Sequence, residues 1–217
     1  MKNIIERHIF AKFRRKYIRF INIQGVESGS DIDIYCVVSD SIKSKVIIFK
    51  ENGIWIEIFI DNWSDMKRKI INYDEICVGL ITSLKNYWGE DYLKQAKKII
   101  PERFRIPLQR KNIFYYRIKV LFSKYKSVLS LHEKNYFKNL IFQQLFMLAF
   151  DYSGRWPESP KKWFSQIKLI NNSYTNKLIS SFDKEEVFIK ICKEEAQKFK
   201  GIKMIKESKN NQFTFIV

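Results

Sequence analysis

The stretch GVESGSDIDIYCVV, residues 25–38, decides the fold of the first half of the chain. A polar turn with two glycines leads into an alternating segment and then an apolar one, as is typical of a half-buried β-strand. Residues two apart on a strand point to the same face, so Asp31 and Asp33 would present two carboxylates side by side. Such charges repel unless a cation lies between them, and Mg²⁺ suits this position because it prefers oxygen ligands.

A β-hairpin is predicted downstream of this strand. The segments KVIIFK (45–50) and IWIEIFID (54–61) are rich in β-branched and aromatic residues, and a short turn separates them. Asn52 and Gly53 in that turn readily adopt the positive φ values that a tight reversal needs. With a short strand at FINIQ, residues 20–24, the region is expected to form a small sheet.

The second strand of this hairpin carries a third carboxylate, Glu57. It shares a face with Trp55 and Phe59, whereas isoleucines make up the other face. A charge in the middle of an apolar strand is unusual unless it faces solvent or a ligand. The alternative is that SGSD forms an ordinary hairpin turn, with Asp31 and Asp33 as its solvated flank.

Together, GVESGSDIDIYCVV and IEIFI resemble the nucleotidyltransferase superfamily of polymerase-beta-like enzymes, over about residues 20–65. That family places a Gly-Ser before an Asp-x-Asp strand and a third acidic residue between apolar neighbours on a later strand. The resemblance implies an α+β fold, in which a small mixed-sheet nucleotidyltransferase-like domain precedes an all-α helical bundle. It also implies that Asp31, Asp33 and Glu57 are catalytic residues that hold two Mg²⁺ ions, for transfer of a nucleoside monophosphate from a nucleoside triphosphate such as ATP to a hydroxyl.

The loop before the Asp-x-Asp strand is shorter than in that family. Gly25 is followed by Val26 instead of Ser, and only five residues separate it from Asp31. Either the backbone N–H groups of the loop cradle the phosphates, or the nucleotide pocket is abbreviated. The resemblance implies that the nucleotide-binding residues are Gly25, Ser28, Gly29 and Ser30.

The remaining sequence reads as mainly helical. Residues 2–20 are expected to form an amphipathic helix, and residues 74–99 carry apolar side chains in near-helical register. Two prolines bracket the connector PERFRIPLQR, which separates a predicted domain 1–105 from a predicted domain 106–217. Further helices are predicted at 112–131, 135–152, 160–170 and 184–200, and the final NNQFTFIV is either a strand or a docked tail.

The segment LFMLAFDYSGRWPESPKKWFSQI, residues 145–167, resembles the C-terminal helical bundle of small-substrate nucleotidyltransferases. In those relatives the bundle holds the acceptor. The alternative is an ordinary interhelical loop in which Trp156 and Trp163 pack the bundle. The resemblance implies that the substrate-binding residues are Tyr152, Arg155, Lys161 and Lys162.

The charge balance favours a phosphate-rich partner. Forty Lys and Arg residues against 23 Asp and Glu give a net charge of +17. Residues 106–217 carry 21 of the basic and 9 of the acidic residues, so the excess is concentrated there. Such a field attracts RNA or tRNA and repels a polycationic aminoglycoside, unless acidic residues cluster locally. A generally Lys-rich proteome would also make a chain basic.

No secretory signal or membrane-spanning segment is apparent in the sequence, and the three cysteines form no disulfide or zinc pattern. A cytoplasmic location is therefore expected, and nothing marks an oligomer interface. The favoured function is Mg²⁺-dependent nucleotidyl transfer, with RNA or tRNA as the acceptor. The alternatives are an aminoglycoside-type antibiotic nucleotidyltransferase and a catalytically degenerate fold that binds nucleic acid or protein. A toxin or antitoxin that modifies a partner also stays open.

Overall fold

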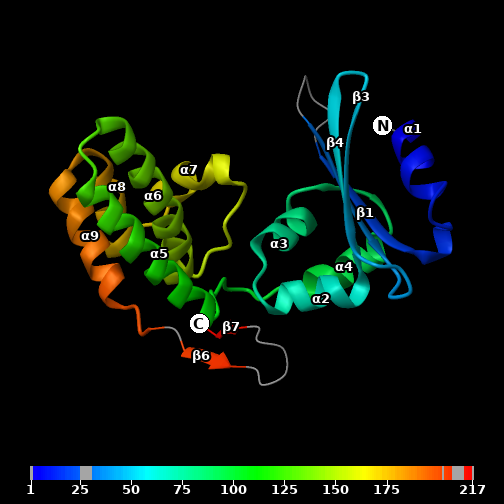
Figure 1. Cartoon of the computed structure of the whole chain (residues 1–217). Coiled ribbons are helices and arrows are strands. Elements are labelled where there is room, and N and C mark those ends of the chain that lie inside the picture. The colour runs from blue at the N-terminus through cyan, green and yellow to red at the C-terminus, as the bar shows by residue number, and fades with distance from the viewer. Residues whose placement is uncertain (1, 25–30, 202, 207–212, 217) are drawn as a thin grey trace. The chain divides into compact units, whose positions relative to one another are not determined.

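A computed structural model describes residues 2–24, 31–201, 203–206 and 213–216. The chain divides into two compact units, Met1–Glu102 and Arg103–Val217, shown in Figure 1. Within the described residues, none of the helices combines the length and the apolarity that a membrane crossing requires.

The first unit is built on a mixed sheet of five strands in the order β3-β4-β2-β1-β5. β2 and β4 run parallel to each other at its centre, and the other neighbouring strands are antiparallel. The strands are β1 (Ile18–Gln24), β2 (Ile32–Val38), β3 (Lys45–Glu51), β4 (Ile54–Asn62) and β5 (Lys85–Trp88).

The predicted hairpin between β3 and β4 is confirmed. Asn52 has φ 51° and Gly53 has φ 83°, so the two turn residues adopt the left-handed conformation that such tight turns require. Seven consecutive residue pairs follow without a bulge, and one of them places Ile48 opposite Glu57. This regular register fixes the face on which Glu57 lies.

One face of the sheet packs against the N-terminal helical segments. These are α1 (Lys2–Ile5), a π-helical turn (Glu6–Phe10) and a 3-10 turn (Arg15–Tyr17), which Figure 1 shows beside the sheet. The predicted single helix over 2–20 is therefore wrong. The chain becomes a strand at Ile18, because the alternating apolar residues that follow pair with β2 and enter the core. That core includes Ile5, Ile9, Phe13, Ile21, Ile34 and Ile58.

Three helices cover the opposite face: α2 (Trp63–Ile71), α3 (Glu75–Thr82) and α4 (Glu90–Lys98) (Figure 1). The predicted helical register over 74–99 is interrupted, because β5 lies between α3 and α4. The Asn86 side chain donates to Ile21 O at 3.3 Å and to Asn22 Oδ1 at 3.1 Å, which ties this short strand to β1. Gly89 then turns the chain into α4 with φ 74°.

The second unit is a helical bundle that ends in a two-stranded antiparallel sheet. One helix, α8, was not predicted; Asn172 and Thr175 begin it with a capping box. Of the C-terminal segment that the sequence left undecided, the described residues Phe213–Ile216 form β7, which pairs with β6. The elements are α5 (Leu108–Ser127), α6 (Leu131–Ser153), a 3-10 turn (Pro160–Lys162), α7 (Trp163–Lys168), α8 (Ser173–Asp183), α9 (Glu185–Gln197), β6 (Lys203–Lys206) and β7 (Phe213–Ile216).

Aromatic rings form much of the bundle core. Phe142 on α6 stacks on Phe182 of α8 with ring centroids 4.0 Å apart, and lies 5.3 Å from Phe188 of α9. Large apolar side chains at the contacts between three helices supply most of the burial that holds such a bundle together. The expected α+β class, a mixed sheet followed by a helical region, is confirmed.

Candidate active site

Two of the three predicted carboxylates face each other across neighbouring strands. Asp33 on β2 and Glu57 on β4 are direct partners in the parallel pairing, and both are half-buried. Neighbouring strands lie about 4.8 Å apart, so the two side chains leave the sheet side by side. Like charges in this position are destabilising unless a cation or a donor lies between them.

The Asp33–Glu57 pair lies on the sheet face that carries α2, α3 and α4. Alternation along β2 puts Asp33 on the same face as Tyr35, whose hydroxyl lies 3.4 Å from Cys77 Sγ on α3. Alternation along β4 puts Glu57 on the same face as Asp61, which binds a lysine of α2. The carboxylate pair therefore lies on the face opposite the N-terminal helices.

The third predicted carboxylate does not share this arrangement. Asp31 precedes β2, which begins at Ile32, and it is exposed. Among the residues that the structure describes, no three His, Cys, Asp or Glu side chains gather closely enough to hold a metal ion. The two facing carboxylates suit a hard divalent cation in their donor chemistry. Gly25, Ser28, Gly29 and Ser30, the predicted nucleotide loop, lie outside the described residues.

An ion pair between a half-buried lysine and a buried aspartate lies farther along the same face. Lys69 Nζ on α2 is 2.8 Å from both carboxylate oxygens of Asp61, and Tyr35 donates a 3.0 Å hydrogen bond to Oδ2. Burial lowers the pKa of Lys69, but the hydrogen bond and the charge of Asp61 outweigh burial and leave that pKa raised. Lys69 is therefore a cation at any physiological pH, and this pairing offsets the cost of burying Asp61.

Cys77 completes this cluster from α3. Its Sγ lies 3.4 Å from the Tyr35 oxygen, and the thiol donates a long hydrogen bond of 3.9 Å to Met66 O. Burial raises the pKa of Cys77 to about 12, and burial is also the largest cause of the raised pKa of Tyr35. Both groups stay protonated at neutral pH, so they act as hydrogen-bonding groups and not as nucleophiles.

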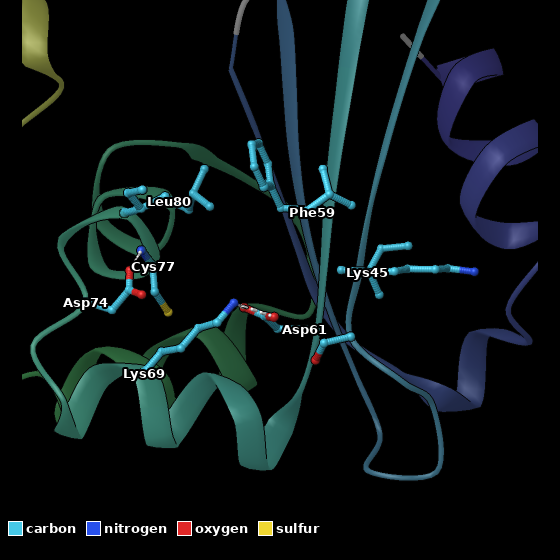
Figure 2. A pocket seen from close by; sticks show the side chains of 11 residues that line it. Lys45, Phe59, Asp61, Lys69, Asp74, Cys77 and Leu80 are labelled. Atoms are coloured by element: carbon cyan, nitrogen blue, oxygen red, sulfur yellow. Dashed lines mark hydrogen bonds and ion pairs between the residues drawn. The ribbon is translucent and has the colours of Figure 1, made fainter. Parts of the chain in front are cut away.

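A cavity of about 320 Å³ opens between this cluster and the neighbouring strands, and Figure 2 shows its lining. In the figure Lys69 points toward Asp61, whereas Lys45 points away from them; Lys45 Nζ lies over the Phe13 ring on the other side of the sheet. This cavity was not predicted from the sequence. We call it the β4–α3 hollow, and its lining includes Val46, Phe59, Asp61, Lys69, Ile76 and Leu80.

The predicted substrate-binding Tyr152 lies in a hydrogen-bonded network within the second unit. Its hydroxyl donates to Glu195 Oε2 at 2.9 Å, and Lys198 Nζ donates to that hydroxyl at 2.9 Å. Tyr115 adds a contact of 3.1 Å between the two hydroxyls. Burial is the main cause of the raised pKa of Tyr152. These contacts link α5, α6 and α9, so Tyr152 has a structural role in the bundle.

The other predicted substrate-binding residues are exposed. Arg155 follows the end of α6, and Lys161 and Lys162 form part of a 3-10 turn. Lys162 donates to Glu158 at 2.7 Å. These three side chains remain accessible, and whether they contact an acceptor stays a prediction.

The two tryptophans beside these residues pack within the bundle, which agrees with the alternative prediction of an ordinary interhelical loop. Trp156 lies 5.0 Å from Phe104 between ring centroids, and Trp163 lies 6.1 Å from Phe150. The Trp163 indole N–H also donates to Glu158 O at 2.8 Å. The rings therefore anchor the loop that carries the exposed basic side chains.

No protein-family model matches the chain, and no curated protein matches it. Among solved structures, it is similar to a nucleotidyltransferase-like protein from Exiguobacterium sibiricum 255-15. The match covers 94% of this chain and 83% of the other, with 12% sequence identity and a TM-score of 0.44. At that score the two backbones agree only loosely, so the chemistry assigned to this chain has to come from its own residues.

The cluster around Asp61 was missed because its members look ordinary in the sequence. An acidic residue at the end of a strand and a lysine on an amphipathic helix are both common at the surface. One signal was present: Asp61 falls four residues after Glu57, and so on the same face of β4. Only the packing of α2 on the sheet shows that this carboxylate is buried.

Proposed function

We propose that the chain is a Mg²⁺-dependent nucleotidyltransferase that moves a nucleoside monophosphate from a nucleoside triphosphate to a hydroxyl acceptor. The observation that carries this proposal is the direct opposition of Asp33 and Glu57 across the parallel β2–β4 pair. Two half-buried carboxylates at that spacing form a strongly negative position on an otherwise basic chain. Phosphate groups would approach such a position only together with a cation.

In the proposed reaction the acceptor oxygen attacks the α-phosphorus of the triphosphate. The new bond is between that oxygen and phosphorus, the bond to the β-phosphate oxygen breaks, and pyrophosphate leaves while the hydroxyl proton passes to solvent. Bound Mg²⁺ would supply charge neutralisation and acidify the hydroxyl. Asp33 and Glu57 would hold Mg²⁺, and the rigid pairing of β2 and β4 would keep these two carboxylates in place. Asp31, exposed ahead of β2, would have to move toward them to add a third ligand.

The proposed acceptor is RNA, such as the end of a tRNA. A net charge of +17 supports this, since the field of the chain attracts polyanions and repels aminoglycosides. The exposed Arg155 and Lys161 add cations that are not engaged in the core of the bundle. Binding would therefore weaken steeply as salt rises.

A nucleic-acid-binding module without catalysis is the second candidate. It is favoured by the position of Asp31, which lies ahead of β2 and does not join the other two carboxylates in a cluster of described residues. The two candidates differ in one measurable respect. A module binds RNA but transfers nothing.

The deciding experiment is a transfer assay with each of the four triphosphates labelled at the α-phosphate, in the presence of Mg²⁺. Total cellular RNA and a panel of aminoglycosides would serve as acceptors. Label on RNA supports the proposal and identifies which triphosphate is the donor. Label on an aminoglycoside would mean that the acceptor is an antibiotic and not RNA. Salt-sensitive RNA binding with no transfer would show that the protein is a nucleic-acid-binding module and not a transferase.

A further inference from the structure

The β4–α3 hollow begins next to the carboxylate pair, on the same face of the sheet. Along β4, Phe59 is two residues beyond Glu57, and Asp61 is four residues beyond it. At about 3.3 Å per residue these steps are roughly 7 Å and 13 Å. A ligand whose reacting end lies between Asp33 and Glu57 can therefore lie along β4 and reach into the hollow.

Two apolar side chains flank the hollow and are exposed to solvent. Val46 on β3 is 55% exposed and Ile76 on α3 is 65% exposed, and both line the cavity. Phe59 and Leu80 add apolar surface between them. Apolar side chains gathered around a concave surface, with a few polar groups, are typical of a small-ligand site.

The polar end of the hollow offers a hydrogen-bond donor. The Asp61 carboxylate already accepts from Lys69 and Tyr35, so it has little remaining acceptor capacity. The Lys69 amine has three N–H donors and its side chain is 41% exposed, so it remains available to an acceptor atom on a ligand. Because Asp61 balances its charge, Lys69 favours a neutral acceptor over a second anion.

The size of the cavity limits the ligand further. Its volume of about 320 Å³ is at the small end of the roughly 300–1,000 Å³ that ligand sites occupy. This accommodates one flat ring system and excludes a chain of sugars or several stacked nucleotides. Apolar walls, the Lys69 donor at the polar end and the short steps along β4 from Glu57 together favour a heteroaromatic ring joined to phosphate through a short linker.

We propose that the β4–α3 hollow binds a nucleobase, with Val46 and Ile76 against the ring and Lys69 donating to an acceptor atom on its edge. This inference rests on the proposed function, since the phosphates of the same or the adjoining nucleotide would lie at Asp33 and Glu57. The base belongs either to the donor triphosphate or to the terminal nucleotide of the acceptor RNA. Both sources share the chemistry of the ring.

The test measures binding of the four free nucleosides by titration calorimetry, which needs neither metal nor catalysis. Ile76→Lys places a charged chain at the mouth of the hollow. Ile71→Lys is its matched control, because Ile71 is 68% exposed on α2 and does not line the hollow. We expect Ile76→Lys to weaken nucleoside binding about tenfold or more, which corresponds to about 1.4 kcal/mol, and Ile71→Lys to leave it unchanged.

A competition experiment then identifies the source of the base. If the nucleoside and the corresponding Mg²⁺–triphosphate displace each other, the hollow holds the base of the donor. If both bind at once and Ile76→Lys weakens only the nucleoside, the hollow holds the base of the acceptor. The assignment is overturned if wild type binds none of the nucleosides at millimolar concentration, or if the two lysine variants bind them alike.

The inference and the proposed function fail in different ways. If nucleoside binding depends on Ile76 but the protein transfers no label, the transferase proposal is wrong and the hollow is still a nucleobase site. If Asp33→Asn abolishes transfer but Ile76→Lys does not change nucleoside binding, only the assignment of the hollow as a nucleobase site is wrong. The free nucleosides carry no phosphate, so their affinity is independent of the carboxylate pair.

Discussion

Asp33 and Glu57 are direct partners in the parallel pairing of β2 and β4, with their side chains on the same face of the sheet. The face is the one that α2 and α3 cover farther along the strands, where Tyr35 and Asp61 meet. Like charges directly opposite on neighbouring strands are destabilising, because the register keeps their Cβ atoms close. The sheet thus holds two acidic side chains next to each other, and the effect of removing one of the charges can be measured.

Removing one of the two charges should stabilise the first unit when no divalent cation is present. We expect Glu57→Gln to raise the free energy of unfolding by up to about 1 kcal/mol in EDTA, because like charges directly opposite on a sheet cost roughly that much. Mg²⁺ should stabilise wild type and not this variant. Urea unfolding with EDTA and with Mg²⁺ measures both effects.

Glu51→Gln is the control for this comparison. Glu51 lies on the same hairpin but on the opposite face, where it contacts Arg7 and His8. Glu51→Gln should lower the free energy of unfolding slightly or leave it unchanged, and should not alter the stabilisation by Mg²⁺. A Glu57→Gln variant that is less stable than wild type in EDTA would mean that this carboxylate has a structural partner.

The Asp33→Asn substitution should abolish nucleotidyl transfer while the protein stays folded. The amide keeps the shape of the side chain but loses the charge that would hold a metal ion. We expect a loss of at least about 100-fold, since even the outer partners of metal ligands are worth roughly 10- to 100-fold. Label transfer measures activity and circular dichroism measures folding. An unfolded variant would show that Asp33 is a structural aspartate.

Breaking the hydrogen bond between Tyr35 and Asp61 should destabilise the first unit. Tyr35→Phe removes only the hydroxyl, and the fully buried ring can keep its packing. The expected loss is about 1–3 kcal/mol, because the bond is to a charged group that stays buried. Urea unfolding measures it, with Tyr136→Phe, an exposed tyrosine of α6, as the control. Equal stability of the two variants would mean that Lys69 alone satisfies Asp61.

The carboxylate face could be predicted from the sequence because its signals are local. Strict alternation around Glu57 assigns that residue to one face, and Asn52-Gly53 fixes the hairpin and its register. The parallel pairing that brings Asp33 opposite Glu57 could not be predicted from these signals. It pairs residues more than twenty positions apart in the sequence, and the residues between them do not determine which strand each one pairs with.

Two parts of the first unit were misread because distant contacts outweigh local propensity. Tyr87 and Trp88 of β5 continue the helical spacing of the apolar residues before them, yet all four residues of β5 are exposed and side-chain bonds from Asn86 hold the strand against β1. Likewise, the end of the predicted N-terminal helix, from Ile18 onward, is the start of β1. In both segments, hydrogen bonding to a neighbouring strand determines the structure.

Stability should fall at alkaline pH through the three buried thiols. Burial raises the pKa of Cys36, Cys77 and Cys192 from 9.0 to about 12. Below pH 9 the thiols are protonated in both states, so they do not change stability. Between pH 9 and 12 the unfolded chain loses their protons first, and each thiol lowers the free energy of unfolding by up to about 1.4 kcal/mol per pH unit.

Urea unfolding at pH 8, 9 and 10 measures this slope, and Cys36→Ala should flatten it because one thiol no longer titrates. The native protein should also resist thiol reagents at pH 8 and react fully in denaturant, since only the thiolate is nucleophilic. Fast labelling of the folded protein, or an unchanged slope in Cys36→Ala, would contradict the pKa values of the folded state.

The largest single destabilisation is expected at the ion pair between Lys111 and Asp151 in the second unit. Lys111 Nζ lies 2.6 Å from Asp151 Oδ2, the Asp151 side chain is almost fully buried, and its other oxygen accepts from Ile106 N at 2.8 Å. Lys111→Met leaves the carboxylate buried without its cation, which typically costs about 3–5 kcal/mol.

The matched control is Lys162→Met, which removes an ion pair of similar length to Glu158 at the surface. Solvent screens that pair, so the expected cost is about 0–1 kcal/mol. Asp151→Asn in the Lys111→Met background should recover part of the loss, because it removes the uncompensated charge and retains a group that accepts from Ile106. If Lys111→Met and Lys162→Met unfold at the same urea concentration, then water reaches Asp151 and the pair contributes little.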